Sequence, residues 1–277
     1  MSPLISASQL QEQLADVLLI DCRHDLSNPQ AGRSAYAEGH LPGAYFLHMD
    51  DDLSGHKTGK NGRHPLPDPQ VLADKLASLG ASRFRNIVAY DAQGGMYAAR
   101  LWWLLRWLGH DQVQVLDGGM AAWQGEWDKY LPKPEAAKFV AELRPELMVG
   151  VEEVLANIKL PLFTVVDARS PSRFKGEGET LDPVGGHIPG AINRFFQDNL
   201  QEDGRFKSAA VLKTEWQLLL AGVDASHTVQ QCGSGVTACH NLLALEVAGL
   251  SGARLYAGSW SEWCTDAARP VAYYRVT

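Results

Sequence analysis

The chain carries the same series of short motifs twice. Four motifs recur in the same order, and the pairs are VLLIDCRHD (17–25) with TVVDARSPS (164–172), GHLPGA (39–44) with GHIPGA (186–191), NIVAYDAQGG (86–95) with TVQQCGSGVT (228–237), and LDGGMAAW (116–123) with YAGSWSEW (256–263). Matched landmark residues in the four pairs are 146, 147, 141 and 140 residues apart. Self-similarity that keeps both order and spacing indicates two copies of one structural unit, each of about 125 residues.

The total length agrees with this division, because single hydrophobic cores rarely extend beyond about 250 residues. We place the first domain at residues 1–129, a linker at 130–147 and the second domain at 148–277. The linker is rich in proline, alanine and charged residues, which is typical of an extended segment, here one that wraps the first domain. The alternative is that this segment forms an edge strand of the second domain.

Within each copy, short apolar runs alternate with helical patterns. The expected strands include LLID, IVAY and VQVLDG in the first copy and TVVDA and ARLYAG in the second; the expected helices include residues 68–80, 98–109 and 236–250. Alternation of strand and helix predicts an α/β fold, with a mostly parallel sheet covered by helices on both faces. Ligands of such sheets bind at the C-terminal ends of the strands.

Composition narrows the range of partners. A net charge of -7 and a pI near 5.7 argue against nucleic acid as a general partner, although a local basic pocket on an acidic protein can still bind a small anion. We see no signal peptide or spanning segment, so we expect a cytoplasmic protein that does not bind membranes. Four scattered cysteines without CxxC spacing predict neither a disulfide framework nor a metal site.

Cys232 lies where a strand should end and a helix should begin, within CGSGVT. A free thiol is mostly protonated at neutral pH, but a helix N-terminus and inward-pointing main-chain N–H groups favour the thiolate. Small residues let the main chain curl around an anion. We therefore interpret Cys232 as an activated nucleophile, against the alternative of a buried structural cysteine. Cys239 and Cys22 are expected in the core.

These motifs together resemble the rhodanese superfamily, and more closely its tandem-domain sulfurtransferases of the thiosulfate and 3-mercaptopyruvate type. The resemblance covers nearly the whole chain and implies two tandem rhodanese-like domains. It implies that Cys232 takes a sulfane sulfur from a small anionic donor as a persulfide and passes it to cyanide, a thiol or thioredoxin. No metal or organic cofactor is implied. The first domain has Asp91 at the position of Cys232, so it should be non-catalytic.

The loop CGSGVT resembles the 3-mercaptopyruvate type, because thiosulfate-preferring members place basic residues directly after the cysteine. The resemblance implies a proton relay of Ser234, His64 and Asp50, and a main-chain anion cradle formed by the loop residues that bind substrate: Gly233, Gly235, Val236 and Thr237. His64 could instead be a loop histidine in a turn. Asp51 and Asp52 adjoin Asp50 and could be confused with it. His40 and His187 recur in both copies, so we expect them to be structural.

The resemblance assigns the donor's anionic group to Arg173, against the alternative of an ordinary surface arginine. Animal 3-mercaptopyruvate enzymes carry a second arginine a few residues later, where this chain has the acidic segment GEGETLDPVGG. Arg194 is a candidate replacement, and thiosulfate remains a second candidate donor.

Two other functions compete with sulfur transfer. A phosphatase of this fold would need an arginine six residues after the cysteine, where Ala238 stands. A non-catalytic sulfur carrier or regulatory binding module would retain the cysteine loop but never release the sulfur.

Overall fold

The structure is a computed structural model that describes residues 2–273. Its contacts divide these residues into two compact units, called here the first and the second unit. The first unit contains residues 2–55, 66–145 and 201–206; the second contains residues 56–65, 146–200 and 207–273. Residues 56–65 therefore pack with the second unit although they belong to the first sequence repeat. This exchange matters for the functional site, because the segment carries His64.

The first unit is built on a parallel sheet of five strands. In spatial order these are β1 (Leu4–Ile5), β5 (Val113–Leu116), β4 (Ile87–Tyr90), β2 (Leu18–Asp21) and β3 (Tyr45–Phe46). The helices are α1 (Ala7–Glu12), α2 (Ala31–Glu38), α3 (Pro69–Ser78), α4 (Ala98–Trp107) and α5 (Gly119–Ala122). β4 is the central strand, so whatever follows it lies at the middle of the C-terminal edge of the sheet.

Helix boundaries in the first unit follow from local chemistry. The Asp68 side chain accepts hydrogen bonds from the N–H groups of Gln70 and Val71, which caps α3, and Pro69 occupies the first helical position. After α4, Gly109 takes a left-handed conformation with φ of +86°, which ends the helix where the sequence predicted.

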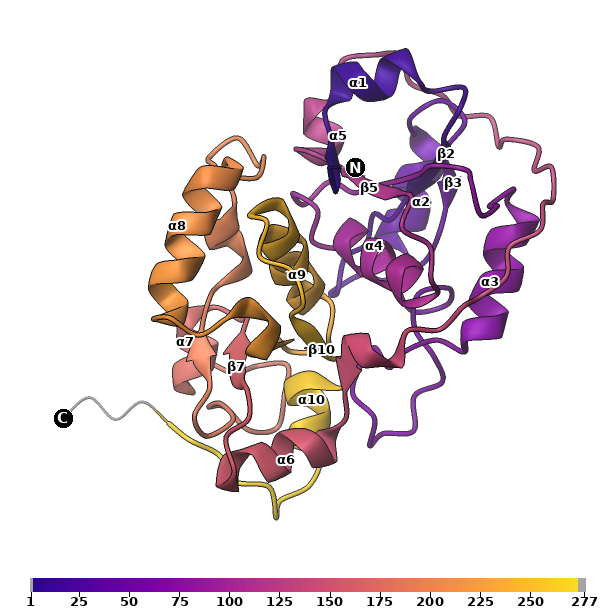
Figure 1. Cartoon of the computed structure of the whole chain (residues 1–277). Helices are drawn as coiled ribbons and strands as arrows, with labels where there is room; N and C mark the ends of the chain where they lie inside the picture. The colour runs from indigo at the N-terminus through magenta and orange to yellow at the C-terminus, as the bar shows by residue number, and fades with distance from the viewer. Residues whose placement is uncertain (1, 274–277) are drawn as a thin grey trace. The chain divides into compact units, whose positions relative to one another are not determined.

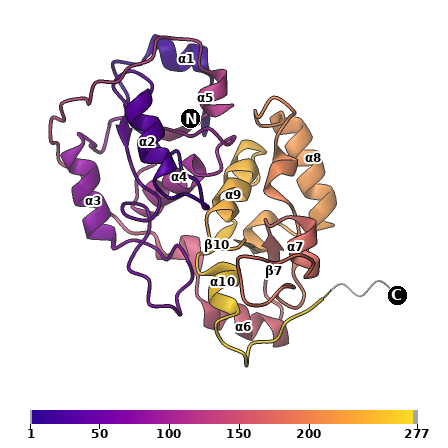
Figure 2. The same cartoon turned by 180° about the vertical axis from the view of Figure 1, so that it is seen from behind.

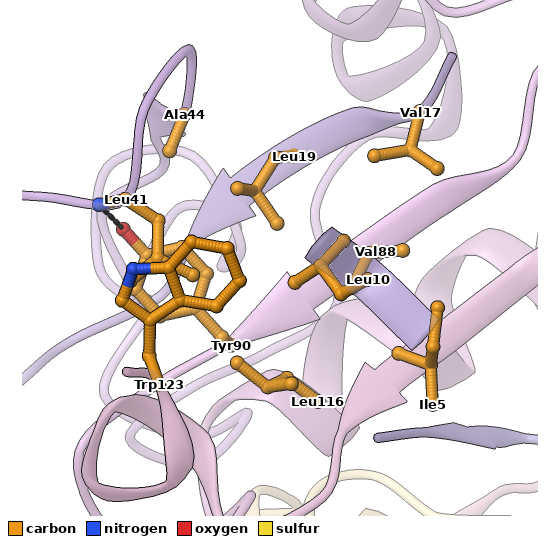
Figure 3. Close-up of a cluster of buried hydrophobic side chains, with 10 residues drawn as sticks. All are labelled: Ile5, Leu10, Val17, Leu19, Leu41, Ala44, Val88, Tyr90, Leu116 and Trp123. Atoms are coloured by element: carbon orange, nitrogen blue, oxygen red, sulfur yellow. Dashed lines mark hydrogen bonds between the residues drawn. The ribbon is translucent and has the colours of Figure 1, made fainter. Parts of the chain in front are cut away.

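Alternating side chains of the strands build two apolar layers on the sheet of the first unit. Leu19, Val88 and Leu116, from three adjacent strands, point to the same face and pack with Leu10 and Trp123 (Figure 3). Residues next to them in each strand point to the opposite face, because side chains alternate along a strand. There α4 packs against β4 and β5.

The second unit repeats this architecture. Its parallel strands are, in spatial order, β6 (Met148–Val149), β10 (Arg254–Tyr256), β9 (Thr228–Gln231), β7 (Thr164–Asp167) and β8 (Ile192–Asn193). The helices are α6 (Val151–Lys159), α7 (Pro171–Lys175), α8 (Ala209–Leu220), α9 (Thr237–Val247) and α10 (Ser259–Trp263), with short 3-10 turns at η2 (Phe196–Asn199) and η3 (Ala225–His227). Figures 1 and 2 show α8 and α9 together on one side of this sheet and α6 and α10 on the other.

A buried ion pair recurs at the same place in both units. Arg23 binds the carboxylate of Asp21 and donates to the carbonyl oxygen of Gly39 at 2.7 Å. Arg169 repeats this arrangement with Asp167 and Gly186. In each unit, this ion pair links the end of β2 or β7 to the GH-x-PGA motif. This link explains why the strand motif and the GH-x-PGA motif occur together in both copies.

The two repeated histidines pack inside their own units. His40 stacks on Tyr36 and hydrogen-bonds its carbonyl oxygen at 2.9 Å; His187 stacks on Phe174 and hydrogen-bonds that residue's carbonyl oxygen at 2.8 Å. Both are buried, in agreement with the structural role expected from their recurrence.

The segment expected to be a linker lies along the first unit as an extended chain. The N–H groups of Ala137, Glu142 and Arg144 donate to main-chain carbonyl oxygens of that unit. A 3-10 turn, η1 (Pro145–Leu147), then leads into β6, so the edge strand begins only at Met148. None of the helices in residues 2–273 is long and apolar enough to cross a membrane.

Candidate functional site

Cys232 directly follows β9, the central strand of the second unit, and α9 begins five residues later at Thr237. The residue is 2% exposed. Its loop is fixed to the start of α10, because the N–H groups of Trp260 and Ser261 donate to the carbonyl oxygens of Cys232 and Gly233 at 3.0 and 2.8 Å. The position agrees with the strand-to-helix turn predicted from the sequence.

The sulfur of Cys232 accepts a hydrogen bond from the N–H of Gly235 at 3.1 Å. The sequence led us to expect several main-chain donors around this sulfur. Within residues 2–273, Gly235 supplies the one N–H that reaches it. Val236 caps α9 and Thr237 is its first residue, so both lie at the helix N-terminus without donating to the sulfur in this state.

Gly235 cannot be replaced without strain. Its φ is +77°, and a Cβ atom there would lie 2.3 Å from the carbonyl oxygen of Ala257. Only a residue without a side chain lets the loop turn its N–H toward the sulfur while lying against the strand-to-helix connection after β10.

The corresponding turn of the first unit holds a carboxylate. Asp91 follows β4, and its Oδ1 accepts hydrogen bonds from the N–H groups of Gln93 and Gly95. Its Oδ2 accepts hydrogen bonds from Tyr97 and Ala98. Burial raises the pKa of Asp91, and these four hydrogen bonds offset part of that shift. The turn therefore directs four main-chain N–H groups at the side chain that follows β4.

His64 and Ser234 are brought together in the second unit. The Nδ1 atom of His64 lies 2.7 Å from the Oγ atom of Ser234, and both residues are buried. The segment that carries His64 is held by the N–H of Arg63, which donates to Ser261 Oγ at 3.0 Å. Gly62 makes this approach possible, because a Cβ there would lie 2.7 Å from the carbonyl oxygen of Gly258.

Asp50 belongs to the first unit. Its carboxylate lies 3.9 Å from Nε2 of His24, and its N–H donates to Nδ1 of His48 at 3.2 Å. Among the described residues, these three form the one group whose ligand atoms are close enough to hold a metal ion. However, His48 also contacts the carbonyl oxygen of Pro29 through Nε2, at 2.7 Å, so both its ring nitrogens already have hydrogen-bond partners.

All three aspartates contact His48: the N–H of Asp51 also donates to its Nδ1 atom at 3.3 Å, and the carboxylate of Asp52 accepts from its N–H at 2.7 Å. Their remaining partners differ. Asp51 pairs with Arg33 at 3.3 Å at the surface, and Asp52 pairs with Lys75 at 3.1 Å. Asp50 is the member of the three that adjoins His24. The structure thus separates three residues that the sequence could not distinguish.

Arg173 lies in α7 and is held by two carboxylates. Its Nε and Nη2 atoms donate to Glu179 at 2.9 and 3.0 Å, and Nη2 also donates to Asp182 at 3.1 Å. Burial would raise the pKa of Glu179, but hydrogen bonds from Arg173 and from nearby main-chain N–H groups lower that pKa below its usual range. Glu179 is therefore charged at neutral pH.

Sequence reasoning missed Arg63. Its guanidinium group forms an ion pair with Asp182, the carboxylate that also binds Arg173. A Cβ atom on Gly233 would lie 2.9 Å from Nη2 of Arg63. The available signal was its position directly before His64 in GRHPLP, but a single arginine in a polar loop has no distinctive pattern of its own.

Arg194, the candidate replacement for a second donor-binding arginine, is engaged elsewhere. Its guanidinium group binds Glu215 at 2.6 Å and Asn199 at 3.2 Å and lies over the ring of Trp216. These contacts account for the side chain as part of the packing around α8.

The other thiols lie in environments that favour the protonated form. Burial raises the pKa of Cys22 well above its usual range, and burial with the nearby negative charge of Asp182 raises the pKa of Cys264 to about 11. Cys239 is buried and donates to the carbonyl oxygen of Gly235 at 3.3 Å.

Comparison with known proteins gives consistent matches over both halves of the chain. The model of the rhodanese-like domain matches residues 6–126 and 150–266. The Pseudomonas aeruginosa protein named "Probable 3-mercaptopyruvate sulfurtransferase" is 46% identical over 277 residues, 97% of each chain. Thiosulfate sulfurtransferase of Bos taurus is 36% identical, over 83% of this chain and 79% of the relative. The crystal structure of SseA from Escherichia coli, described as a 3-mercaptopyruvate sulfotransferase, matches with a TM-score of 0.81 and 30% identity, over 94% of this chain and 99% of SseA.

Proposed function

Because this chain belongs to the rhodanese family and is a sulfurtransferase, we propose that Cys232 is its nucleophile and that 3-mercaptopyruvate is its preferred donor. The observation that carries the proposal is the hydrogen bond from Gly235 N–H to the sulfur of Cys232, at the C-terminal end of the central strand. A fixed donor at this place stabilises negative charge on the sulfur. The four N–H groups around Asp91 in the equivalent turn support the same reading.

In the first half-reaction the thiolate of Cys232 attacks the sulfur of 3-mercaptopyruvate. A sulfur–sulfur bond forms, the carbon–sulfur bond breaks, and its electron pair stays on carbon as the enolate of pyruvate. The proton of the donor thiol must then reach this carbon. Ser234 and His64, in hydrogen-bond contact, are the groups that would carry it, with Asp50 as the third member implied by the family resemblance.

In the second half-reaction an acceptor thiolate attacks the outer sulfur of the persulfide. The sulfur–sulfur bond of the persulfide breaks, a new one forms on the acceptor, and Cys232 returns to its thiolate form. We propose a small thiol or a thioredoxin as the acceptor in a cytoplasmic setting, with cyanide as a laboratory substitute. Arg173 would bind the anionic end of the donor through the edge of its guanidinium group that Glu179 and Asp182 leave open.

The test compares the intact protein with Cys232→Ser and, as a matched control, Cys239→Ser. Intact protein incubated with 3-mercaptopyruvate should gain the mass of one sulfur atom on the peptide containing Cys232, and should lose it when a reduced thiol is added. Cys232→Ser should neither gain the sulfur nor turn over, whereas Cys239→Ser should do both. Turnover by Cys232→Ser would refute the assignment of the nucleophile.

The donor is tested by kcat/KM for 3-mercaptopyruvate beside thiosulfate, with the same acceptor. A higher value for 3-mercaptopyruvate is expected, because the Ser234–His64 pair can deliver the proton that this donor requires and thiosulfate does not. A higher value for thiosulfate would leave the persulfide mechanism in place and overturn the donor preference.

A further inference from the structure

Gln231 directly precedes Cys232 and is fully buried at the end of β9. Neither the oxygen nor the nitrogen of its side-chain amide has a hydrogen-bond partner among residues 2–273. Most buried polar side-chain atoms in proteins have a partner, and an unpaired one costs free energy. Either a bound molecule supplies the missing hydrogen bond, or the protein tolerates an unpaired amide beside its nucleophile loop.

The side chain of Gln231 points to an apolar face of the sheet. Val229, two residues earlier on β9, packs on this face with Ile188 and Trp260. Because side chains alternate along a strand, Gln231 points to the same face as Val229. It pairs in register with Asp167 on the neighbouring strand β7, so these two polar side chains lie next to each other in an apolar layer.

The first unit shows how a tyrosine behaves at the equivalent position. Tyr90 pairs in register with Asp21, as Gln231 does with Asp167. Its hydroxyl donates to Oδ2 of Asp21 at 2.8 Å and accepts from the N–H of Leu41 at 3.2 Å; Figure 3 shows the second of these bonds. A single oxygen atom thus joins the carboxylate at the end of β2 to the GH-x-PGA motif.

The second unit has the same two groups but no tyrosine between them. Ile188 is the equivalent of Leu41 in the GH-x-PGA motif, and its N–H donates to no residue between 2 and 273. Oδ2 of Asp167 accepts a hydrogen bond from Arg169. A glutamine side chain is shorter than a tyrosine side chain, so the amide of Gln231 ends before the place that the hydroxyl takes in the first unit. A carboxylate oxygen, a main-chain N–H and an amide are therefore directed at one place.

We propose that the second unit binds a buried water molecule at this place, with Asp167, Ile188 and Gln231 as its partners. The water accepts a hydrogen bond from the N–H of Ile188 and donates one to Oδ2 of Asp167, as the hydroxyl of Tyr90 does in the first unit. Either end of the Gln231 amide can supply the third bond, because its oxygen accepts and its nitrogen donates. Buried waters typically make about three hydrogen bonds to groups that otherwise have none.

The water would hold the support of the nucleophile loop in place. Asp167 binds Arg169, whose guanidinium group lies 4.6 Å from the centre of the Trp260 ring. The main-chain N–H of Trp260 donates to the carbonyl oxygen of Cys232 at 3.0 Å. The proposed site therefore lies in the buried layer that supports this loop, and it depends neither on which residue is the nucleophile nor on the donor.

The alternative is that protein atoms fill the same place. The second unit has Tyr256 where the first has Leu116, and the larger ring lies in the same apolar layer as Val229. Burial and the nearby carboxylate of Glu262 raise the pKa of Tyr256, which places its hydroxyl near α10. If the ring of Tyr256 nevertheless fills the space, no water fits and the amide of Gln231 stays unpaired.

A crystal structure of the intact protein, at a resolution that shows ordered waters, tests the site directly. Density is expected for one water within hydrogen-bond distance of Oδ2 of Asp167, the main-chain nitrogen of Ile188 and the amide of Gln231. Protein atoms packed at this place, without such density, would overturn the inference.

Gln231→Tyr is the matched variant, because it introduces the residue that the first unit has there. Its hydroxyl should displace the water and bind Asp167 and Ile188. Magnetic relaxation dispersion counts long-lived internal waters in solution, and the count should fall by one from the wild type to Gln231→Tyr. Gln217→Tyr, at an exposed position of α8, is the control and should leave the count unchanged. Equal counts in the wild type and Gln231→Tyr would overturn the inference; should Gln231→Tyr fail to fold by circular dichroism, the wild-type crystal structure decides.

Discussion

The imidazole of His64 lies 2.7 Å from the hydroxyl of Ser234, although 170 residues separate them in the sequence. Both side chains are buried next to the loop of Cys232. A buried hydroxyl and imidazole in contact can pass a proton only if a reaction step supplies or needs one. The two candidate donors differ in this requirement, which makes the contact testable.

Replacement of His64 by Asn should lower kcat to different extents with the two donors. Transfer from 3-mercaptopyruvate leaves an enolate that must be protonated, so kcat with this donor should fall roughly 10²- to 10⁴-fold. Transfer from thiosulfate leaves sulfite, which needs no proton, so kcat with thiosulfate should fall much less. Steady-state kinetics with both donors checks this, and the exposed His56→Asn on the same segment is the control. An equal loss with both donors would argue that His64 shapes the loop instead of moving a proton.

The aspartates at 50 and 51 provide a matched pair. Asp50 lies beside His24, whereas Asp51 pairs with Arg33 at the surface. If Asp50 is the third member of the relay, Asp50→Asn should lower kcat with 3-mercaptopyruvate by roughly 10-fold or more. Asp51→Asn should leave it unchanged, because exposed ion pairs contribute little. The same loss in both variants would show that the acidic segment matters only through its overall charge.

Two glycines with similar backbone angles should respond differently to alanine. Gly190 has a φ of +83° with nothing near its Cβ position, so Gly190→Ala should cost about 1 kcal/mol for the left-handed conformation alone. Gly235 has a φ of +77°, but its Cβ would overlap the carbonyl oxygen of Ala257. Gly235→Ala should therefore cost more than about 3 kcal/mol, or move the loop and abolish turnover. Urea unfolding and kcat/KM check both variants, and equal values for the two would contradict the proposed crowding.

The pH dependence of alkylation at Cys264 should reflect the raised pKa of this thiol. Burial, together with the charge of Asp182, raises the pKa of Cys264 to about 11, so the unreactive thiol persists up to that pH. In the Cys232→Ser background, the rate of labelling by iodoacetamide at Cys264 should rise about tenfold per pH unit between pH 7 and 10. Mass analysis of the labelled peptide measures it. A rate that levels off near pH 8.5, as for an exposed cysteine, would contradict the raised pKa.

Much of the fold could be predicted from local patterns. Three local signals each predict the structure of the residues around them. The structure has a strand at the apolar run before Asp91, a helix start at Asp68 and a helix end at Gly109. The parallel sheets with helices on both faces were likewise predicted correctly, because alternation of strands and helices leaves few other arrangements.

The candidate site was predictable only where a motif marked it. Cys232 and Ser234 belong to one loop, and His64 was found through a family resemblance. The contacts of Arg63 could not be predicted in this way, because Asp182 and Gly233 lie more than a hundred residues away in the sequence. Arg194 was a candidate from its place in the sequence, and its contacts with Glu215 and Asn199 could likewise not be predicted from that place.

The sequence by itself determined that there are two copies of one unit, that a thiol follows a strand in the second copy and a carboxylate follows the matching strand in the first, and which small residues surround that thiol. Those are properties of short segments, where backbone preferences and hydrophobic periodicity act between neighbours. Only the tertiary structure decided that residues 56–65 pack with the second unit and that one buried carboxylate holds two arginines beside Gly233. Electrostatic pairing depends on distance in space, and distance in space is not encoded in the spacing of residues along the chain.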